Sequence, residues 1–219
     1  MTHPDILAAL ARERVNTFLS EEQAARQASL ARAARSRARG KRVVLRDGST
    51  VLIRPVRSMD APLLARGFAR LSPQSRWMRF LGTKTSLSAA ELRYLTDVDH
   101  HDHEAIAALS AADGGGVGIA RYVRDTNDPR SAEIAVTIVD GWQERGLGTE
   151  LLSRLSDLAR QAGIHRFTAL VSTDNAASAG LLRNLGASLV AQGPSIVEYE
   201  LALEPDDYGL DRWIRCAMA

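Results

Sequence analysis

The stretch that decides the fold of this chain reads IAVTIV at residues 134–139, QERGLGT at 143–149 and ELLSRLSDLAR at 150–160. The first segment is apolar and rich in β-branched residues, which is typical of a buried strand. The third carries leucines at 151, 152, 155 and 158, a spacing that predicts a helix with one apolar face. The order is therefore strand, glycine-containing turn, helix.

The glycine-containing turn predicts a phosphate-binding site. Backbone N–H groups at the start of a helix point toward one place and carry partial positive charge. Gly146 and Gly148 have no Cβ, so an anion can approach the main chain closely and the turn can adopt a positive φ. The stretch is neither the G-x-G-x-x-G of a dinucleotide fold nor the GK[ST] ending of a P-loop.

The spacing Q-x-x-G-x-G resembles the pyrophosphate-binding arm of the GCN5-related N-acetyltransferases, the GNAT family, which bind acetyl-coenzyme A. The segments after it extend the resemblance. A strand pattern at 166–171 leads into residues 175–186, which begin with Asn175 and end with Leu185-Gly186, as the family's next helix does. Upstream, residues 50–57 look like the first strand of the family.

Three further segments are similar to one branch of the family, the bacterial protein lysine acetyltransferases of the Pat type. They are residues 68–80, 92–100 and 132–136. The whole resemblance covers residues 43–204. Pat-type proteins often carry a regulatory nucleotide-binding domain, and 42 residues are too few to fold one, so we do not expect regulation by that route.

The resemblance implies the GNAT fold, an α/β domain with a mixed, mostly antiparallel sheet flanked by helices. We expect three parts, namely a basic helical extension at 1–42, a GNAT acetyltransferase domain at 43–204 and a C-terminal tail at 205–219. Periodicity and turn residues predict helices at 5–35, 59–70, 73–81, 87–96, 147–162 and 175–185. They predict strands at 43–46, 50–55, 104–111, 117–124, 132–139, 166–171, 187–191 and 195–202.

The net charge of +2 is unevenly distributed along the chain. Residues 1–42 hold nine Lys/Arg against four acidic residues, a net +5, which leaves −3 for the remainder. A nucleic-acid-binding arm is one interpretation. A solvated helical extension is favoured over it, because no aromatic residue interleaves the arginines to stack on bases. Apolar residues at helical spacing within 5–30 are expected to pack on the domain or on a second subunit, so both a monomer and a homodimer stay open.

Composition predicts a cytoplasmic protein that does not enter a membrane. The sequence has no run of 18 apolar residues, the length a membrane-spanning helix requires. The N-terminus lacks the basic and then apolar order of a secretory signal. The single cysteine, Cys216, cannot form an internal disulfide, which fits a reducing cytosol.

Glu133 is the candidate catalytic residue. A lysine amine has a pKa of about 10.4, so it is protonated at neutral pH and needs a base before it can attack a thioester. Glu133 lies at the start of the strand that leads to the phosphate turn, and alternation places it on one face with Ala135 and Thr137. Pat-type proteins carry their catalytic glutamate in the equivalent A-E-x-A-V context, so the resemblance implies that Glu133 is the base. The alternative is an exposed carboxylate at a strand end.

The resemblance also implies the residues that bind acetyl-coenzyme A. Backbone groups around the end of the strand would contact the acyl and pantetheine portions, and the turn would take the pyrophosphate. Asn175 would lie near the pantetheine arm, although it is also a good N-cap residue. The implied set is Ile138, Val139, Gln143, Glu144, Arg145, Gly146, Leu147, Gly148, Thr149 and Asn175.

Two positions limit these expectations. Many members of the family place a tyrosine seven residues after that asparagine as the acid for the departing thiolate, and here the position holds Leu182, which leaves the acid unidentified. The cluster DVDHHDHE at 97–104 has side chains that suit zinc or nickel, but it forms a single loop and no paired ligands follow elsewhere. We expect no metal and interpret the cluster as a polar loop at the edge of the substrate cleft.

The sequence therefore predicts an acetyl-coenzyme A-dependent N-acetyltransferase. Its expected acceptor is a protein lysine ε-amine, for example on an acyl-CoA synthetase, and transfer is expected to be direct within a ternary complex. Two alternatives stay open at this point. One is a small-molecule amine acetyltransferase, which a closed apolar acceptor pocket would favour, and the other is a non-catalytic acetyl-coenzyme A sensor.

Overall fold

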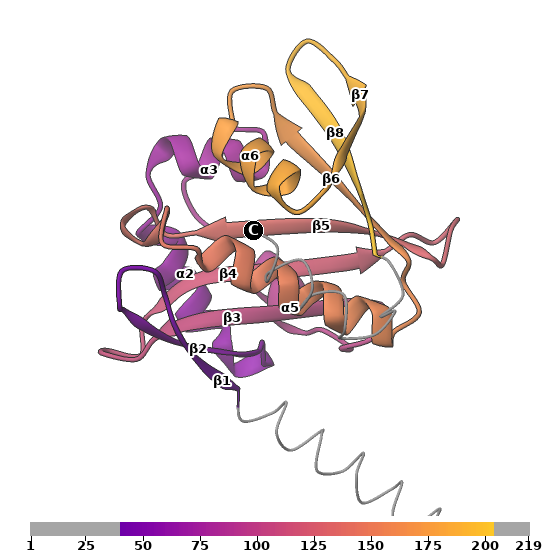
Figure 1. Cartoon of the computed structure of the whole chain (residues 1–219). Helices are drawn as coiled ribbons and strands as arrows, with labels where there is room; N and C mark the ends of the chain where they lie inside the picture. The colour runs from indigo at the N-terminus through magenta and orange to yellow at the C-terminus, as the bar shows by residue number, and fades with distance from the viewer. Residues whose placement is uncertain (1–39, 204–219) are drawn as a thin grey trace, which may run out of the picture. The chain divides into compact units, whose positions relative to one another are not determined.

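A computed structural model describes residues 40–203 and shows eight strands in one sheet (Figure 1). The strands are β1 (Lys41–Val44), β2 (Thr50–Pro55), β3 (His103–Ser110), β4 (Gly116–Arg124), β5 (Ser131–Ile138), β6 (Arg166–Ser172), β7 (Ser188–Gln192) and β8 (Ile196–Ala202). Their order across the sheet is β1-β2-β3-β4-β5-β6-β8-β7. The helical segment expected at 5–35 and the tail at 205–219 lie outside the described residues.

The sheet is mixed, as the sequence predicted. The pairs β2–β3, β3–β4, β4–β5, β6–β8 and β7–β8 are antiparallel, whereas β5 and β6 are parallel. The parallel pair requires a crossover, and helix α5 (Leu147–Gln161) supplies it. The pairing of β5 with β6 covers only Ser131 to Glu133 on β5, after which the two strands separate, as Figure 1 shows.

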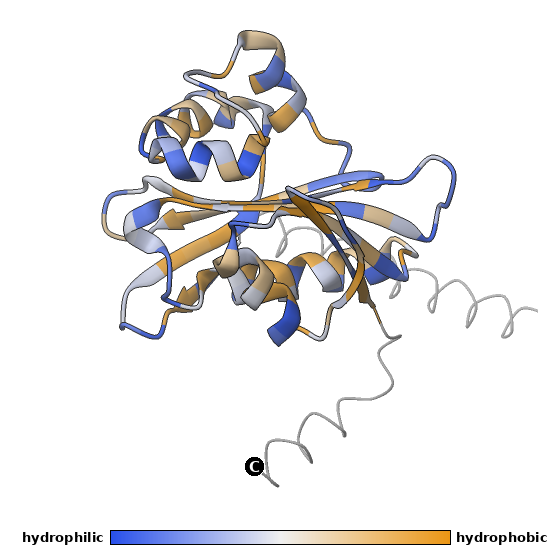
Figure 2. Cartoon of the chain, turned by 90° about the horizontal axis from the view of Figure 1, so that it is seen from above, coloured by the Kyte–Doolittle hydropathy of each residue, from blue (hydrophilic) through white to orange (hydrophobic). Residues whose placement is uncertain are grey.

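Helices cover both faces of the sheet (Figure 2). Helix α5 lies on one face, and α2 (Ala61–Ala69), α3 (Pro73–Phe80) and α4 (Ala89–Thr96) lie on the other. The remaining helix is α6 (Ala176–Asn184), and single 3₁₀ turns, η1 (Ser58–Asp60) and η2 (Asp140–Trp142), precede α2 and the phosphate turn. None of the helices in the described part of the chain is long and apolar enough to cross a membrane.

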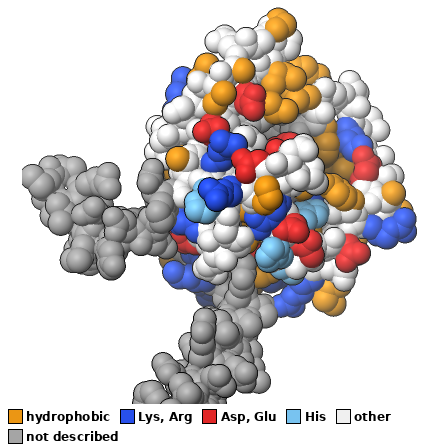
Figure 3. Space-filling view, turned by 90° about the vertical axis from the view of Figure 1, so that its right-hand side faces the viewer, with side chains coloured by type: hydrophobic (Ala, Val, Ile, Leu, Met, Phe, Trp, Pro, Cys, Tyr) orange, Lys and Arg blue, Asp and Glu red, His pale blue; other side chains and the backbone are white. Residues whose placement is uncertain are grey.

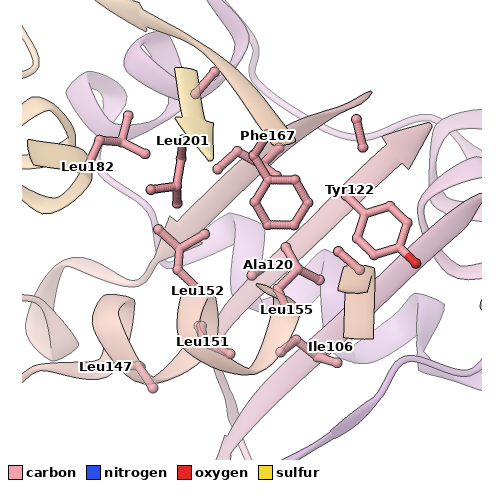
Figure 4. Packing of buried hydrophobic residues seen from close by; sticks show 14 of the residues in the cluster. Ile106, Ala120, Tyr122, Leu147, Leu151, Leu152, Leu155, Phe167, Leu182 and Leu201 are labelled. Atoms are coloured by element: carbon pink, nitrogen blue, oxygen red, sulfur yellow. The ribbon is translucent and has the colours of Figure 1, made fainter. Parts of the chain in front are cut away.

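The main hydrophobic core lies between α5 and the sheet (Figure 4). The leucine spacing of α5 explains this, because Leu151 and Leu155 are fully buried and Leu152 is almost so. They pack in one cluster with Phe167 of β6 and Tyr122 of β4, whose ring centroids are 6.0 Å apart. The core thus fixes α5 against the sheet and, with it, the turn from which α5 begins.

The predicted elements agree with the structure, with small shifts at their ends. Strand β1 starts two residues earlier than expected, and α2 is shorter than the predicted 59–70 because its first turn is the 3₁₀ segment η1. Helix α4 begins after Ser88, whose hydroxyl accepts a hydrogen bond from the N–H of Glu91 at 3.2 Å. Gly163 ends α5 with a φ of 77°.

A buried ion pair joins β2 to the start of α2. Arg54 donates to both carboxylate oxygens of Asp60 at 2.6 and 2.7 Å, and the backbone N–H of Arg57 donates to the same group at 2.8 Å. Asp60 is only 7% exposed. Burial alone would raise the pKa of Asp60, but the hydrogen bonds from Arg54 and Arg57 and the charge of Arg54 outweigh it and hold this pKa below its usual value.

We predict that Asp60→Asn lowers the free energy of unfolding by about 3 kcal/mol at pH 7, because it leaves Arg54 largely buried without a counterion. The wild-type contribution is present above the unfolded-state pKa of about 3.9 and is lost as the pH falls through the lower folded-state pKa. Urea titrations of both proteins between pH 7 and pH 3 measure this difference. Asp157→Asn, in an exposed pair on α5, is the control and should change little. A stability gap that does not shrink in acid would contradict the assignment.

Candidate active site

The turn before α5 has the backbone conformation of an anion site. Gly146 has a φ of 84° and precedes the first helical residue, and Glu144 also has a positive φ, 63°. The first turn of a helix leaves its N–H groups without intrahelical partners. Within the described residues, the N–H groups of Leu147, Gly148 and Thr149 donate to no other protein group. Three donors at one helix start therefore fit the pyrophosphate of acetyl-coenzyme A.

Gly148 has a close neighbour that the sequence did not predict, while the close approach of an anion to Gly148 stays a prediction. It is helical rather than left-handed, and a Cβ there would lie 2.8 Å from Cδ2 of Leu181 and 3.4 Å from Cδ1 of Ile138. Its missing side chain lets α5 approach α6 and the end of β5. Leu147 is 1% exposed, so only its backbone can contact a ligand.

Arg145 is held by its neighbours. Its guanidinium pairs with Asp47 at 2.7 Å, stacks 4.8 Å from the centroid of Trp142 and donates to the carbonyl of Gly141. The backbone of the β1–β2 hairpin joins this contact, since the N–H of Arg46 donates to the carbonyl of Arg145 at 3.2 Å. The hairpin therefore supports the phosphate turn from outside. A contact of Arg145 with phosphate stays a prediction, because the guanidinium already binds Asp47 and the carbonyl of Gly141.

Strands β5 and β6 separate before β5 reaches this turn. The strands part after Glu133 and Thr168, so β5 from Ile134 onward pairs with β4 alone among the described strands. At the end of β5, Gln143 donates through Nε2 to the carbonyl of Ile138 at 3.1 Å, and the N–H of Val139 donates to Val117 at 3.0 Å. Beyond Glu133, the edge of β5 that faces β6 therefore has no strand partner among the described residues, and its backbone groups can bind an extended ligand.

Asn175 and Leu182 belong to α6, the helix that follows β6 in the chain. Asn175 is the N-cap of α6, and its side-chain oxygen accepts from the N–H of Ser178 at 3.0 Å. A role for Asn175 in coenzyme binding stays a prediction. Leu182 is 4% exposed and belongs to the main core. It cannot serve as an acid, so the structure agrees with the sequence in leaving that position without one.

Glu133 lies on the sheet face that carries α2, α3 and α4. The alternation expected along β5 is present, because Ala135 and Thr137 line a cavity on that face while Ile134 packs in the main core on the other. The Glu133 side chain is exposed, and no described residue donates a hydrogen bond to its carboxylate. Burial lowers the pKa of Arg79, and the negative charge of Glu133 opposes this, which places the two groups within electrostatic reach.

The cavity on this face has a volume of about 80 Å³. It lies between α2–α4 and the sheet, and apolar side chains such as Leu64, Phe68 and Ile119 form most of its lining. Two arginines also line it, Arg79 from α3 and Arg121 from β4. The sequence did not single out either arginine, since nothing in the pattern RYVR at 121–124 separates a buried guanidinium from a solvated one.

Asp140 links the phosphate turn to the helices over this cavity. Its carboxylate accepts from the N–H and the hydroxyl of Ser72, both at 2.8 Å, and from the hydroxyl of Ser75 at 2.6 Å. Ser72 is also the N-cap of α3. The side chain of Asp140, between β5 and α5, thus positions α3. The sequence did not predict this contact, because Ser72 and Ser75 are 68 and 65 residues away from Asp140.

We predict that Asp140→Ala raises the KM of the acceptor while the affinity for acetyl-coenzyme A stays nearly unchanged. The reason is that α3 loses its tie to the turn, whereas the N–H groups of residues 147–149 are untouched. Because the carboxylate is exposed, the free energy of unfolding should fall by only about 1 kcal/mol. Steady-state kinetics with calorimetry separates these effects, and an equal loss in both affinities would contradict this role.

The loop at 97–104 forms its own network rather than a ligand cluster. Asp99 accepts from the N–H groups of residues 101, 102 and 103 at 2.8 to 2.9 Å, His100 contacts the buried Glu104 at 2.7 Å, and His101 contacts Asp102 at 2.8 Å. In the described part of the chain, no group of three or more His, Cys, Asp or Glu could hold a metal ion. Figure 3 shows acidic, basic and histidine side chains side by side at this end of the sheet.

The chain matches known acetyltransferases in sequence. A family model described as an acetyltransferase (GNAT) domain matches residues 50–188. Acetyltransferase Pat of Mycolicibacterium smegmatis is 33% identical over 165 residues, which are 75% of this chain and 49% of that protein. Acetyltransferase PA5475 of Pseudomonas aeruginosa is 39% identical over 144 residues, 65% of this chain and 77% of that protein.

The structural match agrees with the sequence match. The GNAT domain of S. lividans PAT aligns with a TM-score of 0.71 and 29% identity, over 74% of this chain and 96% of that one. The chain therefore belongs to the GNAT family of acetyl-coenzyme A-dependent N-acetyltransferases. Within that family it is similar to Pat, and it spans about half the length of the M. smegmatis Pat protein.

Proposed function

We propose that the protein transfers the acetyl group of acetyl-coenzyme A to a lysine ε-amine of an acceptor protein, by direct attack within a ternary complex. The observation that carries this proposal is the position of Glu133. It marks the point where β5 parts from β6, and it shares a strand face with the cavity under α2–α4. The coenzyme would enter from the phosphate turn, and the acceptor from the cavity side.

In this mechanism each residue has a limited task. Glu133 accepts the proton that the amine loses as its nitrogen bonds to the acetyl carbon, either directly or through a water, while the carbon–sulfur bond breaks. The turn from Gln143 to Thr149 holds the pyrophosphate, and backbone groups of Ile138 and Val139 align the thioester. Asn175 would contact the pantetheine arm. A thiol with a pKa near 8.5 leaves without strong acid assistance, so the absence of a tyrosine at Leu182 is tolerable.

The acceptor is proposed by the resemblance to Pat-type lysine acetyltransferases, with an acyl-CoA synthetase as the first protein to test. We further propose that the reaction takes place in the cytoplasm, in keeping with the single cysteine. The apolar lining of the cavity favours a second candidate, a small-molecule amine acceptor. The basic extension at 1–42 has no role in either proposal.

A panel of acceptors tests the choice. Purified protein and acetyl-coenzyme A are incubated with a lysine-bearing acyl-CoA synthetase, with free amino acids and with polyamines, and coenzyme A release is followed beside mass spectrometry of the products. The proposal expects kcat/KM to be highest for the protein and the acetyl group to appear on lysine. Turnover confined to the small amines would replace the lysine proposal with the second candidate.

A further inference from the structure

Arg121 is a buried cation to which no described residue supplies a hydrogen-bond acceptor for Nη1 or Nη2. It lies in the middle of β4, it is 5% exposed, and both terminal nitrogens, Nη1 and Nη2, are buried with no hydrogen-bond acceptor among the described residues. A buried guanidinium normally pairs with a carboxylate, because leaving it unpaired costs several kcal/mol of solvation. Arg54, also on this side of the molecule, shows the usual arrangement with Asp60. Arg121 therefore presents two unused, parallel donors.

No carboxylate among the described residues pairs with Arg121. Its guanidinium lies over the ring of Tyr94, whose centroid is 5.0 Å from Cζ, and the charge of Arg79 acts on it. Burial and the charge of Arg79 lower the pKa of Arg121 to about 10, so it stays protonated at neutral pH. His103 on β3 is close enough to be affected by Arg121, and burial lowers its pKa to about 4, so it is neutral there. Its Nε2 is also buried without a partner.

The charges on this sheet face do not balance. Arg79 and Arg121 are positive, Glu133 is the one acid that acts on Arg79, and Asp60 in the cavity wall is already paired with Arg54. One further negative charge would balance these groups. Arg121 is one of the residues that line the cavity, so a ligand that enters it and displaces the atoms covering Nη1 and Nη2 can supply that charge.

The register of the sheet relates Arg121 to the proposed base. Arg121 pairs with Ala135 and Val123 pairs with Glu133, so Arg121 and Glu133 are diagonal neighbours on one face. Such neighbours are about 7–8 Å apart. An acceptor whose amine is at Glu133 can therefore place a second group at Arg121 if a few bonds separate the two.

We propose that Arg121 binds a carboxylate of the acceptor, by two parallel hydrogen bonds within the cavity under α2–α4. This rests on the proposed function, because it assumes that the acceptor enters on the Glu133 face. The carboxylate is either the α-carboxylate of a free amino acid or an acidic side chain next to the modified lysine in a protein. Arg121 then favours acceptors that carry a carboxylate. Its terminal nitrogens lack a hydrogen-bond partner only until such an acceptor binds.

Two pairs of acceptors test the proposal and distinguish the two sources. The first pair is Nα-acetyl-L-lysine and its methyl ester, which share one ε-amine and differ only in the carboxylate. The second is a capped peptide with Asp after the lysine and the same peptide with Asn. Coenzyme A release gives kcat and KM for wild type, Arg121→Met, Arg121→Lys and the control Arg130→Gln, which alters an exposed arginine on the β4–β5 loop.

The wild type should show a KM about tenfold lower for the carboxylate member of one pair, and that pair identifies the source. Arg121→Met should abolish this preference, Arg121→Lys should weaken it because lysine cannot form two parallel bonds, and Arg130→Gln should keep it. A preference absent from the wild type in both pairs, or retained in Arg121→Met, would overturn the proposal while leaving acetyl transfer intact.

A measurement without turnover keeps the two proposals separate. In the presence of coenzyme A, Nα-acetyl-L-lysine or the Asp peptide should raise the Tm of the wild type but not that of Arg121→Met. Arg121→Met alone should fold with an equal or higher Tm, because it loses no hydrogen bond and removes an unpaired buried charge. A large fall in its Tm would instead mean that Arg121 has a structural role, and would overturn the inference. If no amine is acetylated, the proposed function is wrong. The change in Tm still shows whether Arg121 binds a carboxylate.

Discussion

Replacing Glu133 by Gln is expected to lower kcat/KM for the amine acceptor by about 10²- to 10⁴-fold, the range that general-base catalysis contributes. The substitution keeps the size of the side chain and removes its ability to take a proton. The affinity for acetyl-coenzyme A should stay unchanged, because the N–H donors of the turn lie at the far end of β5 from Glu133. Calorimetry with acetyl-coenzyme A and kinetics of coenzyme A release measure the two quantities.

The pH dependence gives a second test of the same residue. With the base removed, the rate should depend on the small fraction of acceptor amine that is already neutral, and it should climb about tenfold per pH unit until the amine pKa of about 10.4 is reached. Glu198→Gln on β8 is the matched control and should leave kcat/KM unchanged. If Glu133→Gln retains wild-type kcat/KM, Glu133 is only an exposed carboxylate at a strand end.

Replacing Gly148 by Val is expected to weaken acetyl-coenzyme A binding by more than about tenfold and to lower the free energy of unfolding by about 1–3 kcal/mol. Even a Cβ at this position would meet Cδ2 of Leu181 at 2.8 Å, and valine adds two methyl groups, so we expect α5 to be displaced from α6 where the Leu181 side chain cannot move aside. That displacement moves the helix start that carries the pyrophosphate donors. Calorimetry and urea unfolding measure the two effects.

Gly180→Val is the control for this substitution. Gly180 is also helical, on α6, and a Cβ there would meet nothing within 4 Å. The control should keep its coenzyme affinity and its stability, since helical glycine is itself unfavourable by about 1 kcal/mol relative to residues with a side chain. If Gly148→Val binds acetyl-coenzyme A as the wild type does, the close approach of α5 to α6 does not position the turn.

The turn and the strands beside it were predictable from sequence because their signals are local. A period of two along 134–138, a period near 3.6 along 147–161 and glycines between them require only neighbouring residues. Gly146 behaves as expected, with its positive φ. Gly148 is helical, so the expected positive φ is absent there, and its contact with Leu181 on another helix could not be predicted from local sequence.

The acceptor side of the site was much less predictable. Glu133 was identified through resemblance, and its face of β5 followed from alternation. Arg121, Arg79 and Asp140 depend on which elements meet in space. No sequence pattern predicts that Asp140 accepts a hydrogen bond from a serine 68 residues earlier. None predicts that the terminal nitrogens of an arginine on β4 are buried without an acceptor among the described residues.

The most direct test of the central claim, that this is a working N-acetyltransferase, is coenzyme A release from acetyl-coenzyme A by the wild type, measured with calorimetric binding on the same protein. We predict binding together with turnover that requires an amine acceptor and leaves an acetylated lysine on the acyl-CoA synthetase. Tight binding with no turnover on any protein or small amine would contradict it and would identify the chain as an acetyl-coenzyme A sensor.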